Sequence, residues 1–277
     1  MSTIRLPAVS GTFYPANPRI LKKEIEGYLG KAPSGGLPGE IMGLVSPHAG
    51  YMYSGQTAAY GYRVIAGASF DTVIIIAPSH RSFFVGAAID DQEIYRTPLG
   101  DIPVDTELAT ELVEENDFIH INSKVHSGEH SLEVQLPFLQ SVLKGFSIVP
   151  IIMGTQDAES CQRLSSIIVD RIKQKKKKCL LVGSTDLSHY YPYDEAVEID
   201  AVAVKNLNGF DVEGMIKDLA VEHYEACGAG AMIATMMVCR ELGANRSRVL
   251  KYTNSGDVSG DRGSVVGYVS SVFFKES

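Results

Sequence analysis

Two stretches of the chain follow one pattern: Gly43-Leu44-Val45-Ser46-Pro47-His48 and, about thirty residues later, Thr72-Val73-Ile74-Ile75-Ile76-Ala77-Pro78-Ser79-His80. In both, an apolar run ends at a proline and a histidine follows within two residues. A third apolar run, Cys179 to Gly183, leads into Ser184-Thr185-Asp186-Leu187-Ser188-His189. Three buried strands that each deliver an imidazole just past the carboxyl end predict one shared site.

The same stretches predict the fold class. The run from Thr72 to Ala77 is β-branched on both faces, as expected for a strand buried between helix layers. A helix is expected between the two strands, from about residue 55 to 66, with Ser54 as its cap. Strand, helix and strand joined by short loops form a βαβ unit, so the two strands should run parallel.

The alternation of strands and helices continues along the chain. A helix is predicted from the Asn17-Pro18 cap to about Gly30, and a hairpin-like excursion over 85–104. Further strands are expected at about 146–153, 178–183, 248–253 and 264–274, and helices at about 106–115, 157–175, 194–208 and 228–242. No internal repeat or linker interrupts this order. We therefore expect a single α/β domain over residues 1–277, with a largely parallel or mixed sheet flanked by helices.

Composition excludes several classes of protein. The formal net charge of −8 over 277 residues argues against a surface for nucleic acid or anionic membrane, which needs clustered positive charge. The one basic run, Lys173 to Lys178, ends a predicted helix, where cations suit the helix dipole. No signal peptide or membrane-spanning stretch is evident. The four cysteines are scattered, as in reduced proteins. We expect a soluble cytoplasmic protein.

The strand ends indicate metal chemistry. In open α/β sheets, binding sites form beyond the carboxyl ends of the strands. Two histidines and one carboxylate suit non-haem Fe(II). We predict His48 and His80 as metal ligands, and Asp257 or Asp261, from the loop before the last strand, as the carboxylate.

Two further residues suit proton transfer. His189 with Asp186 is typical of an imidazole oriented by a carboxylate, acting as general acid and base. The alternative is a turn histidine beside a capping aspartate.

Other candidates have a second reading. Glu129 and His130 are predicted to lie at the site and contact the substrate, although Glu129 could instead cap the next helix. Tyr51 is predicted as part of the pocket wall, with a core position as the alternative. Cys227 precedes a predicted helix whose N-terminus would stabilise a thiolate; a small packed residue is the favoured reading.

Taken together, several motifs resemble the Memo family. They are Gly11-Thr12-Phe13-Tyr14-Pro15, Pro47-His48-Ala49-Gly50-Tyr51, Pro78-Ser79-His80, Glu129-His130-Ser131-Leu132-Glu133, Ser184-Thr185-Asp186-Leu187-Ser188-His189 and Cys227-Gly228, which span nearly the whole chain in order. The resemblance implies the fold of class III extradiol ring-cleavage dioxygenases, whose Fe(II) is held by two histidines and a glutamate. It matches His48 and His80 to the metal histidines, and His189 to the proton-handling one.

The resemblance leaves the third ligand to be assigned. Animal members of the family carry a cysteine in the loop that reads Asp257-Val258-Ser259 here, so we expect Asp257 to replace it. An oxygen donor favours Fe(II) over Cu(I), because thiolate is the softer ligand. The cofactor prediction is therefore Fe(II), with copper or no metal as alternatives.

Three functions follow as hypotheses. The first is a metal-dependent redox enzyme acting on a small hydroxylated substrate. The second is a non-catalytic module that uses the same pocket for a peptide or phosphorylated ligand. The third, hydrolysis with Ser184 or Ser188 as nucleophile, lacks a G-x-S-x-G elbow. The resemblance also implies partners from one pathway, a radical-SAM protein and an AMMECR-type protein.

Overall fold

Four parallel strands form the centre of the protein. The computed structural model describes residues 2–114 and 116–276. In it, β2 (Glu40–Ser46), β9 (Cys179–Ser184), β3 (Thr72–Pro78) and β8 (Ser147–Met153) lie side by side in that order. Every residue of β3 is buried, which agrees with its β-branched sequence. The predicted parallel pairing at the strands that precede the histidines is confirmed.

Antiparallel strands extend both edges and make the sheet mixed. The order across the larger sheet is β10 (His189–Tyr191), β12 (Val265–Lys275), β2, β9, β3, β8, β4 (Ala87–Ile89) and β7 (Ile119–Ile121), with β11 (Arg246–Asn254) also pairing with β12. A second, small sheet consists of β1 (Ile4–Arg5), β5 (Ile94–Thr97) and β6 (Gly100–Pro103). The hairpin predicted over 85–104 corresponds to β5 and β6, which pair antiparallel.

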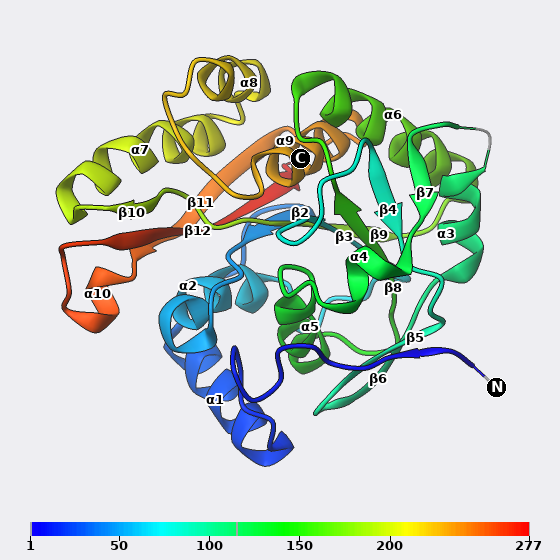
Figure 1. The fold of residues 1–277 in the computed structure, drawn as a ribbon, viewed down its shortest axis with the longest axis horizontal. Helices are drawn as coiled ribbons and strands as arrows, with labels where there is room; N and C mark the ends of the chain where they lie inside the picture. The colour runs from blue at the N-terminus through cyan, green and yellow to red at the C-terminus, as the bar shows by residue number, and fades with distance from the viewer. Residues whose placement is uncertain (1, 115, 277) are drawn as a thin grey trace.

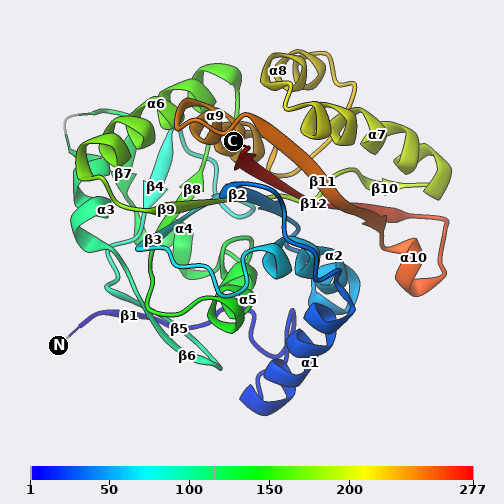
Figure 2. The same ribbon diagram turned by 180° about the vertical axis from the view of Figure 1, so that it is seen from behind.

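Helices cover both faces of the larger sheet, as Figures 1 and 2 show from opposite sides. One layer holds α6 (Ala158–Lys175), α7 (Tyr193–Gly209), α8 (Val212–Ala220) and α9 (Ala229–Glu241). The other holds α1 (Pro18–Lys31), α2 (Tyr51–Val64) and α5 (Leu136–Val142). The remaining helices are α3 (Thr106–Val113), α4 (Ser123–Ser127), η1 (Glu133–Gln135) and α10 (Gly256–Ser259). The predicted α/β class is confirmed.

Several helices begin directly after a residue whose side chain caps them. The Asn17 side chain accepts hydrogen bonds from the first backbone amides of α1, and Asp105 and Asp157 do the same for α3 and α6. The prediction that Ser54 caps the second helix is wrong. That helix begins at Tyr51, so Ser54 lies inside it. The Ser54 hydroxyl donates to the carbonyl of Ala49, just before the helix.

Close packing of α9 on the sheet fixes the loop that precedes this helix. A Cβ atom at Gly183 on β9 would lie 2.7 Å from Thr235 Oγ1 and 3.0 Å from the carbonyl oxygen of Ala231. Only glycine therefore lets α9 lie this near the strand. The N-terminus of α9 is thereby held beside the carboxyl end of β9. Among the described helices, none is long and apolar enough to cross a membrane.

Candidate metal centre at the carboxyl edge of the sheet

Three histidines from three loops meet at the carboxyl edge of the sheet. His48 follows β2, His80 follows β3, and His130 lies in the loop between α4 and η1. One ring nitrogen from each can be chosen such that all three lie within 4.8 Å of one another. The ring centroids of His48 and His80 are 5.1 Å apart, and those of His80 and His130 are 4.6 Å apart. This group has the donors to bind a metal ion.

A serine fixes the orientation of the His48 ring. Ser184 Oγ lies 2.6 Å from the carbonyl oxygen of Ser131 and donates its hydrogen there. The same oxygen lies 2.9 Å from His48 Nδ1, so it accepts from an Nδ1–H group. This tautomer, assigned from the hydrogen-bond network, leaves the lone pair on Nε2.

One buried carboxylate holds the other two histidines. Glu129 accepts from the backbone N–H groups of His80, His130 and Ser131 at 2.7–3.0 Å. Its Oε1 also lies 2.9 Å from His80 Nδ1 and 3.2 Å from His130 Nδ1. Burial raises the pKa of Glu129, but these hydrogen bonds outweigh burial and hold the pKa far below its usual range. The carboxylate therefore stays charged and orients both rings, with Nε2 free for a metal.

Electrostatics keep the His48 ring neutral. Burial lowers the pKa of His48 well below its usual range, and the neighbouring His80 and His130 rings lower it further. A neutral imidazole is the form that ligates metals, so no proton has to leave His48 when an ion binds.

Cys227 lies at the cluster. The sequence analysis missed this, because it favoured a small packed residue at that position. The Cys227 Sγ is 3.0 Å from His48 Nε2, the nitrogen that carries the lone pair, and accepts from the backbone N–H of Asp186 at 3.3 Å. Burial raises the pKa of this thiol. The available signal was its place in sequence, directly before Gly228 and α9. The three-histidine group thus offers nitrogen donors, and the neighbouring side chain is a thiol rather than the predicted carboxylate.

A cavity of about 540 Å³ opens onto this cluster. Its lining includes the three histidines and Cys227, and it adds five further residues: Asp186, His189, Tyr190, Glu225 and Ala226. The volume lies within the range of small-molecule sites. The predicted pair Asp186 and His189 thus belongs to the same cavity as the three histidines.

The contacts of Asp186 and His189 differ from the predicted pairing. Asp186 Oδ1 accepts from the backbone N–H of His48 at 2.8 Å, so this carboxylate positions the loop after β2. Burial raises the pKa of Asp186 to about 6. His189 Nδ1 lies 3.5 Å from Glu225 Oε1, an ion-pair partner that the sequence reading missed. Glu225, rather than Asp186, is therefore in contact with the His189 ring.

The structure does not bring Tyr51 to the cavity. Its side chain is 3% exposed, packs against Phe138 and donates its hydroxyl to the carbonyl of Val134. Tyr51 therefore occupies a core position, which was the alternative prediction for it. The reason is that α2 begins at Tyr51 itself, so its first turn points the ring into the layer of α1 and α5.

The structure also keeps Asp257 away from the histidines. Asp257 lies exposed on α10, where its carboxylate accepts from the Tyr193 hydroxyl at 2.8 Å and the Asn254 backbone at 3.1 Å. Neither Asp257 nor Asp261 lines the cavity that holds the described metal cluster. The predicted carboxylate ligand has no counterpart in this geometry.

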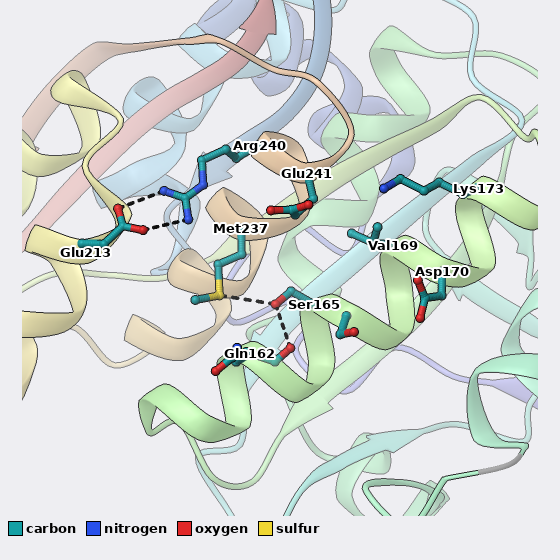
Figure 3. Close-up of a pocket in the computed structure, with 10 residues that line it drawn as sticks. Gln162, Ser165, Val169, Asp170, Lys173, Glu213, Met237, Arg240 and Glu241 are labelled. Carbon is teal, nitrogen blue, oxygen red and sulfur yellow. Dashed lines mark hydrogen bonds and ion pairs between the residues drawn. The ribbon is translucent and has the colours of Figure 1, made fainter.

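A second cavity of about 440 Å³ lies between α6 and the α8–α9 pair and shares no lining residue with the first (Figure 3). Its Arg240 guanidinium is held by Glu213 through two hydrogen bonds of 2.9 Å. Met237 and Ser165 contact each other across its floor. Among the described residues, the group able to hold a metal ion is the three-histidine cluster, and none of its members lines this second cavity.

Fold and site together define a single-domain α/β protein with a histidine-rich candidate metal centre at the carboxyl edge of its sheet. The family model described as Memo-like protein matches residues 5–272. A MEMO1 family protein of Methanopyrus kandleri is 38% identical over 97% of this chain and 98% of its own length. One from Methanosarcina mazei is 38% identical over 96% and 98%. The chain belongs to the Memo-like family, as its motifs predicted.

One solved structure shows a similar fold. The crystal structure of an uncharacterised protein from Escherichia coli K12 superposes with a TM-score of 0.54 and covers 84% of this chain and 99% of its own. Sequence identity is 11%, so this similarity shows the fold alone.

Proposed function

We propose that the protein is a metal-dependent redox enzyme that acts on a small hydroxylated substrate. The observation that carries this proposal is the convergence of the His48, His80 and His130 nitrogens within 4.8 Å. Glu129 and Ser184 orient the rings through hydrogen bonds, as residues behind metal ligands do in metalloenzymes. A peptide-binding surface would not need three imidazoles whose Nδ1 atoms are each held by Ser184 or Glu129.

His48 and His80 would hold the metal, with Cys227 or His130 as the completing donor. Imidazole suits iron, copper and zinc, and the thiol adds a softer ligand. The oxygen donor expected from the sequence is not at the cluster, and a thiol suits Cu(I) as well, so the choice of Fe(II) rests on the resemblance of the motifs to extradiol dioxygenases. An Fe(II) ion held by these residues would supply a site for a substrate oxygen and O₂.

The remaining cavity residues would manage protons and substrate. His189 faces Glu225 through Nδ1, which leaves its Nε2 for proton transfer to or from a substrate hydroxyl. Asp186 fixes the His48 backbone, which holds that imidazole at the cavity. The substrate hydroxyl would therefore lose its proton to a group already positioned by a carboxylate.

The test is an anaerobic titration of purified protein with Fe(II), followed by oxygen uptake on a panel of phenols and diols. We expect one tightly bound Fe(II) per chain and oxygen uptake with at least one compound. A parallel titration with Cu(I) compares the metals. No uptake across the panel with iron bound would exclude ring cleavage, and no binding of either metal would exclude the metal-dependent enzyme.

Asp257→Ala is expected to leave Fe(II) affinity unchanged, within about twofold, because its carboxylate is bonded to Tyr193 and Asn254. The same anaerobic titration measures it. A loss of affinity of tenfold or more would return Asp257 to the ligand set.

A further inference from the structure

Tyr190 has a backbone conformation that is uncommon for a tyrosine. Its φ angle is +68°, in the left-handed region that favours glycine. The other non-glycine residues described with positive φ are Lys176, Phe210 and Glu222. Lys176 and Phe210 cap α6 and α7, and Glu222 directly follows the cap of α8, where left-handed residues are common. Of these four, Tyr190 alone lies in a strand.

A β-bulge accounts for this conformation. His189 pairs with Val266 and Tyr191 pairs with Val265, so two steps along β10 match one step along β12. Tyr190 is the extra residue. Bulges redirect side chains and are frequent beside active sites.

The bulge brings two consecutive side chains to one cavity. Successive side chains of a regular strand point to opposite faces. Here His189 and Tyr190 both line the 540 Å³ cavity that contains His48 and His80. The left-handed residue is what allows both to do so.

The Tyr190 ring contributes little to the folded core. It is 76% exposed, and the contact described for its ring is an edge-on one with His189 at 5.7 Å. Within the described residues its hydroxyl has no hydrogen-bond partner. A strained backbone and an exposed aromatic ring both disfavour tyrosine at this position, and strain of this kind clusters at ligand sites.

We propose that Tyr190 is a positioning residue whose ring forms a stacking platform for a small ligand with a flat aromatic ring. Aromatic faces favour offset or edge-on contact with another ring over contact with a puckered aliphatic one. The platform lies beside His189, so a stacked ring would have its polar substituents directed at the histidine cluster. The choice of an aromatic substrate rests on the proposed function, whereas the stacking itself does not.

The test compares two hydroxamates that share one metal-binding head. Benzohydroxamate carries a flat ring, and cyclohexanecarbohydroxamate carries a puckered ring of similar size. Each is titrated calorimetrically into wild type, Tyr190→Phe, Tyr190→Gly and Lys176→Gly, with the protein loaded with Fe(II) under argon and also metal-free. The readout is the ratio of the two Kd values, because the contribution of the shared head cancels.

Wild type, Tyr190→Phe and Lys176→Gly are expected to prefer the flat ring by about tenfold. Tyr190→Gly is expected to lose this preference. Both glycine variants should raise Tm by about 2 °C, because glycine relieves a left-handed backbone. Lys176→Gly is the matched control, since it relieves the same strain at the end of α6, outside the cavity.

Each outcome decides the proposal. A ratio near one in wild type, a ratio unchanged in Tyr190→Gly, or no binding of the flat probe in either state overturns it. A fall in Tm for Tyr190→Gly would show that the ring serves the fold, and would also overturn it. If Fe(II) fails to load but the metal-free ratio behaves as expected, the metal centre fails and the platform stands.

Discussion

Replacing Glu133 by alanine is expected to lower the free energy of unfolding by about 3–5 kcal/mol, because it leaves a buried guanidinium without its counter-charge. Glu133 is fully buried. Its Oε2 accepts from Arg5 Nη1 at 2.8 Å and from the backbone N–H of Ala8 at 2.7 Å. Its Oε1 accepts from the Val9 backbone at 3.0 Å and the Tyr14 hydroxyl at 2.6 Å. Four donors would lose one acceptor group.

The Glu133→Ala substitution should also disturb the candidate metal centre. Arg5 also donates to the backbone carbonyls of His126 and Glu129, at 3.0 and 2.8 Å. The N-terminal segment therefore braces the loop that carries Glu129 and His130. A total stability of about 5–15 kcal/mol is usual for a domain, so this variant should be close to unfolding.

Urea unfolding followed by far-ultraviolet circular dichroism measures the effect. The matched control is Asp101→Ala, which removes the carboxylate from an exposed ion pair with Arg96. Exposed pairs contribute little, so its midpoint should stay at the wild-type value. Equal midpoints for Glu133→Ala and wild type would contradict the assigned role of the Arg5–Glu133 pair.

The parts of the fold that could be predicted are those that local sequence determines. The β-branched run of β3 forms a strand in any buried context, and Asn17 caps α1 through its own side chain. The positions of His48 and His80 could be predicted from the strands, since each histidine lies two residues past the end of a parallel strand. Their meeting is a consequence of strand order.

The rest of the site depends on tertiary packing. His130 and Cys227 come from loops with no strand before them, and their positions are set by the Arg5–Glu133 pair and by the close approach of α9 to Gly183. Neither contact is local in sequence. Spacing alone could not place these residues against His48.

The prediction of Asp257 as a metal ligand is wrong for a geometric reason. Asp257 follows β11, which ends at the same edge of the sheet as β2 but is separated from it by β12. Two strand spacings amount to about 9–10 Å, and α10 then turns the chain aside. The sequence predicted correctly at which edge of the sheet Asp257 lies, but not its position along that edge.

His80→Ala is expected to weaken Fe(II) binding by at least about 100-fold, since even residues that only orient metal ligands are worth about 10–100-fold. The His80 side chain is 30% exposed, so its removal should leave the fold intact. Its loss removes one donor of the cluster and the Nδ1 partner of Glu129. Competition with a chromogenic chelator under argon measures the affinity, and thermal unfolding of the metal-free protein checks the fold.

The matched control for this prediction is His189→Ala. Both histidines line the same cavity, but His189 lies outside the described three-histidine group and is paired with Glu225. This variant should keep Fe(II) affinity within about twofold of wild type and lose oxygen uptake, because it lacks the proton-transfer group. Equal weakening of iron binding in both variants would place His189 among the ligands. Unchanged binding in His80→Ala would mean that the cluster at the ends of β2 and β3 does not hold the metal.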